Sequence, residues 1–352
     1  MMALLFAAAA LWALAWVFGV PMRVRLVVLG VVWLAIVAAH LLLPAEIPFR
    51  ANTGGDARPW LVLAILALAI WGYRALLARL RRRAQAKAPA PPDTTPKPLF
   101  SDTELNRYAR HMMLREVGGP GQRALKQAKV LVIGAGGLGS PALLYLAAAG
   151  VGTIGVIDDD TVDGTNLQRQ IIHTDARIGM PKVFSAQAQM QALNPFVTVQ
   201  PYHRRLTEAE AEQLFAQYDL ILDGTDNFDT RYLTNRIAVQ CGKPLIAAAI
   251  TQWEGQIALY DPARGGPCFE CLFPERPAPG LVPSCAEAGV IAPLPGVLGS
   301  MMAVEALKTL TNAGAPLRGA LVIYDGLYGE SRRMTTHARA DCPVCHGKGA
   351  TA

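Results

Sequence analysis

A glycine-rich hexapeptide, residues 134–139 (GAGGLG), is the first stretch whose residue types suggest chemistry. It fits the G-x-G-x-x-G pattern between an expected strand at 129–133 and an expected helix at 138–149, so backbone amides and a helix N-terminus can meet phosphate there. Asp158 ends the next expected strand, about 20 residues past Gly137, where an acid commonly binds ribose hydroxyls. These features predict a nucleotide site that includes Gly134, Gly136, Gly137, Gly139 and Asp158. A dinucleotide oxidoreductase would show the same features.

The polar residues that follow distinguish the possible reactions. Lys182 opens the next expected helix, Asp226 and Asn227 follow a further strand, and a polar loop contains Thr165, Asn166, Leu167, Gln168 and Arg169. All are expected near the carboxyl edge of the sheet, where open α/β folds bind ligands. Arg and Lys neutralise phosphate charge and an acid can hold Mg²⁺, which favours phosphoryl or nucleotidyl transfer over hydride transfer. Taken singly, each cation could be a solvated charge, and Asp226 could cap a helix beginning near Asn227.

Two cysteine pairs, Cys268-x-x-Cys271 and Cys342-x-x-Cys345, are separated by a long insertion. Four thiolates can close a tetrahedral structural zinc site, which we favour over disulfides or unligated thiols. The second pair, followed by His346, also spells the attachment pattern of c-type haem. That interpretation leaves the first pair unexplained, so zinc is the prediction.

Two cysteines remain outside these pairs. Cys241 follows an apolar stretch and is expected to be a small buried core residue. Cys285 lies in a segment rich in proline and glycine, and its reactivity depends on whether its surroundings are electropositive and partly exposed. The histidines show no partner spacing and are interpreted as residues without a functional role; they include His111, His173, His203 and His337.

Alternating apolar runs and helical patterns must position these side chains. The expected strands are 129–133, 153–158, 196–202, 219–223, 244–250, 255–261 and, as the last, 320–325. The expected helices are 138–149, 181–192, 207–217 and 297–311. This alternation predicts an α/β fold with a Rossmann-like, mostly parallel sheet covered by helices on both faces.

The first 80 residues have a different composition, and they contribute strongly to the 52% hydrophobic content of the 352-residue chain. Apolar runs extend over Ala3 to Val20, Val24 to Leu43 and Trp60 to Tyr73. Because about 20 apolar residues span a bilayer, we expect two or three transmembrane helices. A cleavable signal peptide is disfavoured because no basic residue precedes the first run and a second run follows at once.

A basic cluster follows the third apolar run and contains Arg74, Arg79, Arg81, Arg82, Arg83 and Lys87. By the positive-inside rule, the rest of the chain is expected in the cytoplasm of a bacterial-type cell, beneath its inner membrane. These charges account for the formal net charge of +6, so attraction to anionic lipid suffices and no nucleic-acid partner is expected. The predicted organisation is a multi-pass membrane anchor over 1–80, a basic, proline-rich linker over 81–98 and a catalytic domain over 99–352.

From Leu99 onward the chain resembles the MoeB/ThiF/HesA family of E1-like adenylating enzymes. The resemblance is carried by the motifs RYAR (107–110), GAGGLG, DDD (158–160), TNLQRQ, GMPK, DGTDN, PCFEC, SCAEAGV and CPVC. Thr165 stands where the family usually has Ser, which preserves the hydroxyl. The membrane segment lies outside the usual pattern of the bacterial family members.

The resemblance implies a specific activity. A small ubiquitin-fold sulfur carrier, of the molybdopterin-synthase or thiamine-pathway type, would be adenylated with ATP on its C-terminal Gly-Gly carboxylate. Asp226 would hold Mg²⁺, Arg110 would reach the phosphates from the other subunit of a homodimer, and Cys285 would serve as a catalytic or sulfur-transfer thiol. ATP would contact the glycine turn, Asp158, the loop 165–169, Lys182, Asp226 and Asn227. No rhodanese-like segment follows Gly349, so a separate sulfur-donor protein is expected.

Two other functions fit parts of the same sequence. An NAD(P)-dependent oxidoreductase would share the glycine turn and Asp158. A catalytically silent membrane scaffold would share the fold, but it has no physical need of Arg110, Arg169, Lys182 and Asp226.

Overall fold

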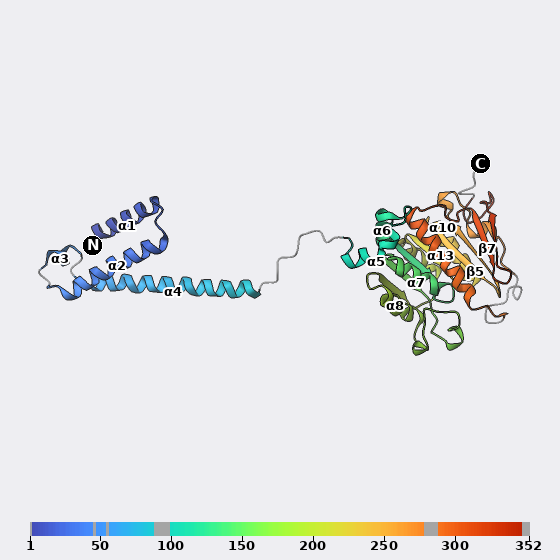
Figure 1. Ribbon diagram of the computed structural model, residues 1–352, viewed down its shortest axis with the longest axis horizontal. Helices are drawn as coiled ribbons and strands as arrows, with labels where there is room; N and C mark the ends of the chain where they lie inside the picture. The colour runs from blue at the N-terminus through green and yellow to red at the C-terminus, as the bar shows by residue number, and fades with distance from the viewer. Residues whose placement is uncertain (1, 45–46, 54–55, 88–98, 278–287, 347–352) are drawn as a thin grey trace. The chain divides into compact units, whose positions relative to one another are not determined.

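The protein is described by a computed structural model that covers residues 2–44, 47–53, 56–87, 99–277 and 288–346. It divides into two compact units, Met1–Pro96 and Lys97–Ala352. Each unit is described here by itself, and Figure 1 shows the elements of both.

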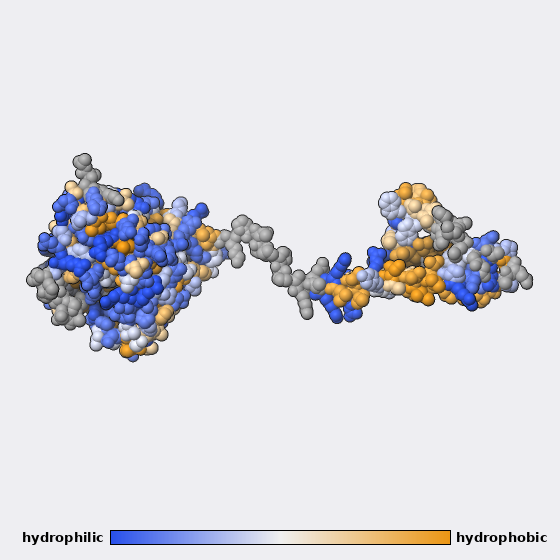
Figure 2. Space-filling view, turned by 180° about the vertical axis from the view of Figure 1, so that it is seen from behind, coloured by the Kyte–Doolittle hydropathy of each residue, from blue (hydrophilic) through white to orange (hydrophobic). Residues whose placement is uncertain are grey.

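Helices are the regular elements of the N-terminal unit in its described part. Its helices are α1 (Met2–Val17), α2 (Met22–Leu42), α3 (Pro48–Asn52) and α4 (Arg58–Lys87). Two stretches, Met22–Leu42 and Arg58–Arg83, are long and apolar enough by length and composition to cross a membrane. Apolar side chains are exposed along α1, α2 and α4, as the orange surface of this unit in Figure 2 shows.

A small polar cluster joins α2, α3 and α4. The His40 Nε2 atom lies 2.8 Å from the Thr53 hydroxyl oxygen, and the Trp60 indole donates a hydrogen bond to the Thr53 carbonyl at 3.0 Å. Trp33 donates in turn to the Trp60 carbonyl at 3.1 Å. These hydrogen bonds fix the turn between α2 and α4.

The C-terminal unit is built on an eight-stranded sheet of order β3-β2-β1-β4-β5-β6-β7-β8. The strands are β1 (Lys129–Ile133), β2 (Thr153–Ile157), β3 (Thr198–Tyr202), β4 (Leu220–Asp223), β5 (Leu245–Ile250), β6 (Glu254–Tyr260), β7 (Ala320–Asp325) and β8 (Glu330–Thr335). The first five in spatial order pair in parallel, and β6 to β8 are antiparallel. The expected α/β architecture with a mostly parallel sheet is confirmed.

Helices cover both faces of this sheet. They are α5 (Asp102–Met112), α6 (Gly118–Gln127), α7 (Gly139–Ala149), α8 (Lys182–Leu193), α9 (Glu208–Ala216), α10 (Phe228–Gln240), α11 (Phe269–Leu272) and α13 (Pro293–Thr311). Short 3-10 turns lie at Gly164–Asn166, Asp175–Arg177 and Pro262–Arg264. Gly150 ends α7 in the left-handed conformation, with φ 82°, which glycine adopts without a Cβ penalty.

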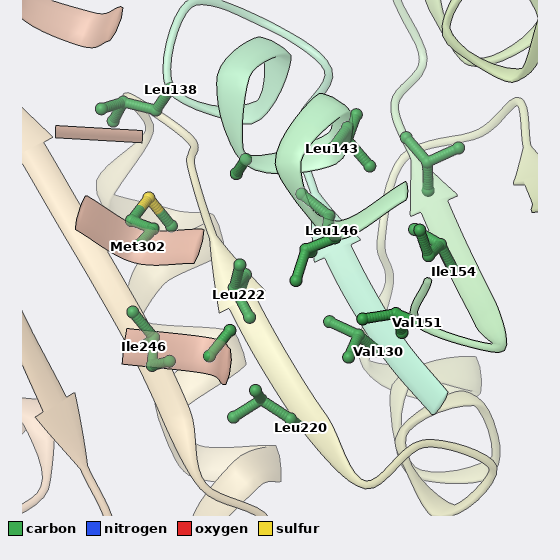
Figure 3. Packing of buried hydrophobic residues seen from close by; sticks show 14 of the residues in the cluster. Val130, Leu138, Leu143, Leu146, Val151, Ile154, Leu220, Leu222, Ile246 and Met302 are labelled. Carbon is green, nitrogen blue, oxygen red and sulfur yellow. The ribbon is translucent and has the colours of Figure 1, made fainter. Parts of the chain in front are cut away.

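Alternate residues of β1 show how the two faces are filled. Val130 and Val132 pack with residues of α7, α8 and α13 in one buried cluster, part of which is drawn in Figure 3. Leu131 and Ile133 belong to a second cluster with residues of α9 and α10. Strand side chains point alternately to opposite faces, so a run that is apolar throughout places one core on each side.

The structure corrects three expectations. The expected last strand, 320–325, is followed by β8, which pairs with it antiparallel from Ala320↔Thr335 to Asp325↔Glu330. All six residues of β8 are exposed, so the strand lacks the apolar pattern that marks buried strands. Helix α13 begins at Pro293 and not at Val297. Cys241 is half-buried at the end of α10, where the helix meets solvent, and is not a buried core residue.

Candidate active site

A pocket of about 800 Å³ lies at the carboxyl ends of the parallel strands. β1 is flanked by β2 on one side and by β4 on the other, so the chain reverses its direction of winding there. Open α/β sheets bind ligands in the crevice outside such a reversal. The pocket is lined by nine of the predicted residues, namely Gly134, Gly136, Gly137, Asp158, Asn166, Arg169, Lys182, Asp226 and Asn227.

The glycine turn owes its shape to two of its four glycines. Gly134 has a φ of 92°, and a Cβ at Gly139 would lie 2.0 Å from the Gly134 carbonyl oxygen. Only glycine allows the start of α7 to pack so closely on the end of β1. Gly139 is therefore needed for the turn but does not line the pocket, whereas Gly136 and Gly137 do.

Asp158 follows β2 and is bound to the glycine turn. Its Oδ2 accepts a hydrogen bond from the Ala135 amide at 2.7 Å, and its Oδ1 accepts one from the Asp160 amide at 2.8 Å. Burial raises the pKa of Asp158, while the charge of Lys182 and the two amide hydrogen bonds oppose that rise. The carboxylate keeps unused lone pairs, so it can still accept hydrogen bonds from ribose hydroxyls.

The polar loop contributes two of its five predicted residues to the pocket. The Arg169 guanidinium donates to Asn166 Oδ1 at 2.8 Å, and both side chains line the pocket. The Thr165 hydroxyl instead donates to Asp163 Oδ1 at 2.5 Å. Among the residues that the structure describes, Thr165, Leu167 and Gln168 do not line the pocket.

Lys182 is the first residue of α8, and its side chain is buried against the pocket wall. The ammonium group pairs with Asp160, whose carboxylate faces solvent. A buried cation with an exposed partner is placed to meet a phosphate, because the phosphate can share or replace that partner.

Three acidic or amide side chains at and after the end of β4 have different roles. Asp223 is buried and accepts hydrogen bonds from the Thr225 amide and hydroxyl at 2.9 and 2.7 Å. Asn227 is the N-cap of α10 and accepts from the Thr230 amide at 3.1 Å. Asp226 is exposed and makes no hydrogen bond or ion pair with any described residue. The capping role considered for Asp226 belongs to Asn227, and the Asp226 carboxylate remains available to hold Mg²⁺.

Three arginines that line the pocket were missed from the sequence. Arg204 pairs with Glu210 at 3.1 Å, and Arg205 pairs with Asp159 at 3.4 Å. Both follow β3, so their position after an expected strand was a signal that could have found them. Arg231 is buried and donates to the Ala248 carbonyl at 2.6 Å, and the sequence of α10 gives no signal for this contact.

Arg110 lies on α5, where its side chain is exposed, and it does not line the described pocket. Cys285 falls in 278–287, outside the described residues. His173, by contrast, is buried behind the glycine turn with partners at both ring nitrogens, which its sequence spacing did not predict.

The two predicted cysteine pairs meet in one buried cluster. The Sγ atoms of Cys268 and Cys271 are 3.7 Å apart, and the Cys268–Cys342 and Cys271–Cys345 sulfur distances are both 3.5 Å. Zn–S bonds of about 2.3 Å in a tetrahedron require sulfur separations of about 3.8 Å. Burial and the neighbouring sulfurs raise the pKa of Cys268, so a divalent cation would relieve the cost of holding thiolates together. The residues therefore fit a structural zinc ion.

The cysteine cluster and the pocket share one short helix. α11 begins directly after Cys268 and contains Cys271. The ring of the pocket-lining Phe269 meets Tyr232 edge-to-face at 5.3 Å and lies tilted against Phe273 at 4.9 Å, measured between ring centroids. The side-chain amide of Asn235 on α10 accepts from the Phe269 amide at 2.9 Å. α10 thus connects the helix of the cysteine cluster with the Asp226 end of the pocket.

Comparisons with known proteins show which family the chain belongs to. Residues 108–344 match the model of the ThiF family. A sulfur carrier protein adenylyltransferase of Thermus thermophilus is 51% identical over 250 residues, which cover 70% of this chain and 92% of the relative. The probable adenylyltransferase/sulfurtransferase MoeZ of Mycobacterium tuberculosis is 48% identical over 256 residues, which cover 72% of this chain but only 65% of MoeZ.

A solved structure shares the fold at lower identity. The crystal structure of E. coli MccB superposes with a TM-score of 0.61 at 22% identity, over 73% of this chain and 76% of MccB. At that identity the match supports the fold alone.

Proposed function

The chain belongs to the ThiF family, and on that premise we propose that it is an ATP-dependent adenylyltransferase acting on a sulfur-carrier protein. The substrate carboxylate would be that of a C-terminal Gly-Gly on a small ubiquitin-fold carrier. One carboxylate oxygen attacks the α-phosphorus of ATP and the bond to the β-phosphate oxygen breaks. The products are an acyl-adenylate and pyrophosphate.

The observation that supports this proposal most strongly is that Arg169, Lys182 and Asp226 line one pocket together with the glycine turn. Catalysis would come from positioning and charge neutralisation, because a carboxylate and a triphosphate repel each other until cations screen them. The amide of Gly136 and the carboxylate of Asp158 would orient the nucleotide. Mg²⁺ held by Asp226 would neutralise charge on the departing pyrophosphate.

The two alternatives account for less of this arrangement. A dinucleotide oxidoreductase uses the glycine turn and Asp158 but has no need of Asp226 as an exposed acid without a partner among the described residues. A silent scaffold would need neither the buried Lys182 nor the Arg169–Asn166 contact.

Arg110 would act across a homodimer, because it is exposed on α5 and lies outside the described pocket of its own chain. Co-expression of Arg110→Ala chains with Asp226→Ala chains tests this arrangement. If Arg110 acts in the partner's pocket, mixed dimers keep one intact site and regain part of the activity. Activity no higher than in either variant alone would place Arg110 in its own chain's site or outside the reaction.

The N-terminal unit would anchor the enzyme in a bacterial-type inner membrane, with the catalytic domain in the cytoplasm. Support comes from the two long apolar helices and from the basic end of α4, whose charges favour the cytoplasmic side. A separate protein would supply sulfur. Carbonate extraction of membranes tests the anchor, since a chain that washes off with the peripheral proteins is not inserted.

The activity is tested by carrier-dependent exchange of labelled pyrophosphate into ATP. Exchange should appear with a carrier ending in Gly-Gly and vanish when the terminal glycine is removed. Binding of NAD(P) without ATP–Mg²⁺ binding would support the oxidoreductase, and full biological activity of Asp226→Ala would support the scaffold. Intact-mass capture of the carrier adenylate with Cys285→Ala shows whether adenylation needs that thiol.

A further inference from the structure

The imidazole of His173 ties together three segments that line the pocket. Its Nε2 lies 2.9 Å from the carbonyl oxygen of Ala135, in the middle of the glycine turn. Its Nδ1 lies 2.9 Å from the hydroxyl oxygen of Ser185, one turn along α8 from Lys182. His173 itself follows the loop that carries Arg169, and its side chain is buried. One side chain therefore sets the spacing of the turn, the loop and the helix.

The chemistry of the partners fixes the protonation of this imidazole. A carbonyl oxygen can only accept, so Nε2 carries the hydrogen and donates to Ala135. The Nδ1 atom of the neutral ring then accepts from the Ser185 hydroxyl. Burial lowers the pKa of His173, and the charges of Lys182 and Arg177 lower it further, against the opposing hydrogen bond to Ala135. The neutral ring thus has both of its nitrogens satisfied.

The contact with Ala135 determines where the next amide points. The described peptide bonds are all trans, and in a trans peptide the carbonyl and the following N–H point in opposite directions. Since the Ala135 carbonyl points to His173, the Gly136 N–H points away from His173, and Gly136 is one of the residues that line the pocket. The Ala135 N–H is also engaged, by Asp158 Oδ2 at 2.7 Å. Both peptide groups of Ala135 are therefore held in place.

We propose that His173 is a positioning residue for ATP, which holds the Ala135–Gly136 peptide with its N–H directed at the triphosphate. The choice of ATP as ligand rests on the proposed function. The imidazole does not contact the nucleotide. It keeps the phosphate-facing amide, Arg169 and Lys182 at fixed separations, so its loss weakens binding of the phosphates and leaves binding of the nucleoside unchanged.

The test measures the dissociation constants of ATP and adenosine on the full chain in detergent, by calorimetry and by ligand-observed NMR. In His173→Phe a phenyl ring fills the place of the imidazole, but the buried Ala135 carbonyl loses its donor. ATP should therefore bind about 10-fold more weakly, while adenosine binds as before. In His173→Gln the side-chain amide can donate in place of Nε2, and ATP affinity should return to within about 3-fold of the unmodified chain. His337→Phe, at an exposed histidine, is the matched control and should change neither constant.

Three outcomes overturn the proposal. The first is a folded His173→Phe variant that binds ATP as the unmodified chain does, and the second is an equal loss for ATP and adenosine, which indicates general damage. If His173→Phe does not fold, Ser185→Ala is used instead, because it removes the partner of His173 Nδ1. The third outcome is an unchanged ATP affinity in that variant. These binding measurements need no carrier. If the unmodified chain binds ATP but supports no pyrophosphate exchange with any carrier, the proposed function fails while the role of His173 is still decided.

Discussion

The Nζ atom of Lys182 lies 2.7 Å from Oδ2 of Asp160, although the lysine side chain is only 6% exposed and the aspartate side chain is 65% exposed. The cation is thus held at the start of α8 by a partner that water can solvate. A phosphate entering the pocket could take over the ammonium group, and the aspartate would lose little by turning to solvent. The pair holds the Lys182 side chain in place and leaves its ammonium group able to bind a phosphate.

This arrangement predicts unequal effects of removing the two partners. Lys182→Met should lower kcat/KM of pyrophosphate exchange by about 100-fold, the size of effect seen when one preorganised charge at a transition state is lost. Asp160→Asn should cost less than about 10-fold, since the lysine remains and the side-chain oxygen of asparagine can still accept a hydrogen bond from its ammonium group. Steady-state exchange kinetics measure both. Equal losses would show that the pair acts as a unit.

Asp226 and Asn227 are neighbours with separate roles, and substitution should separate them. Asp226→Asn should reduce exchange by about 100-fold or more and weaken its dependence on Mg²⁺, with no change in Tm, because the side chain is exposed and makes no hydrogen bond or ion pair with any described residue. Asn227→Ala should lose the cap of α10, about 1 kcal/mol of unfolding free energy. That loss corresponds to a Tm lower by about 2–4 °C in a domain of this size. A drop in Tm for Asp226→Asn would contradict its assignment as a free metal ligand.

The cysteine cluster should hold about one zinc ion per chain, measured by elemental analysis of the purified protein. Cys342→Ser should abolish the bound zinc and lower the Tm, because three buried thiolates no longer complete the tetrahedron. Cys241→Ser is the matched control, since this half-buried cysteine lies outside the cluster. Full zinc content in Cys342→Ser would exclude the four-cysteine site.

The raised pKa of Asp158 predicts opposite effects of pH on folding and on binding. Burial raises this pKa above its ordinary value of 3.8. The contribution of Asp158 to stability is therefore complete below the unfolded pKa and is lost as pH rises through the folded pKa. Ribose binding needs the carboxylate as an acceptor, so ATP affinity should fall as pH drops through the same raised pKa. Titrations of ATP binding against pH, compared with Asp158→Asn, isolate this effect because ATP itself titrates equally in both.

The apolar strands and the glycine turn were predictable because their patterns are local. Lys129–Ile133 is apolar after its first residue. A strand that is buried on both faces of a parallel sheet has such a continuous apolar run, whichever strands it pairs with. The spacing from Gly137 to Asp158 follows from the length of one strand-helix-strand unit. The meeting of the two cysteine pairs was also predictable, since the C-x-x-C spacing is typical of pairs that ligate one ion.

The rest depended on contacts between distant residues. β8 is an exposed edge strand, and the polar sequence ESRRMT has no alternation to reveal it. The separate roles of Asp226 and Asn227 depend on where α10 begins, which sequence patterns fix only to within a few residues. The contacts of His173 cannot be predicted from the sequence, because its partners, Ala135 and Ser185, come from two other segments and have no characteristic spacing.

The two open edges of the eight-stranded sheet have a consequence for how the chain behaves when concentrated. β3 contains Pro201, which has no N–H to donate to a further strand, and the outer strand β8 carries the exposed charged residues Glu330, Arg332 and Arg333. An incoming strand would meet a missing donor at one edge and charged side chains at the other. Non-specific strand addition, the first step of β-aggregation, is thereby disfavoured at both ends of the sheet.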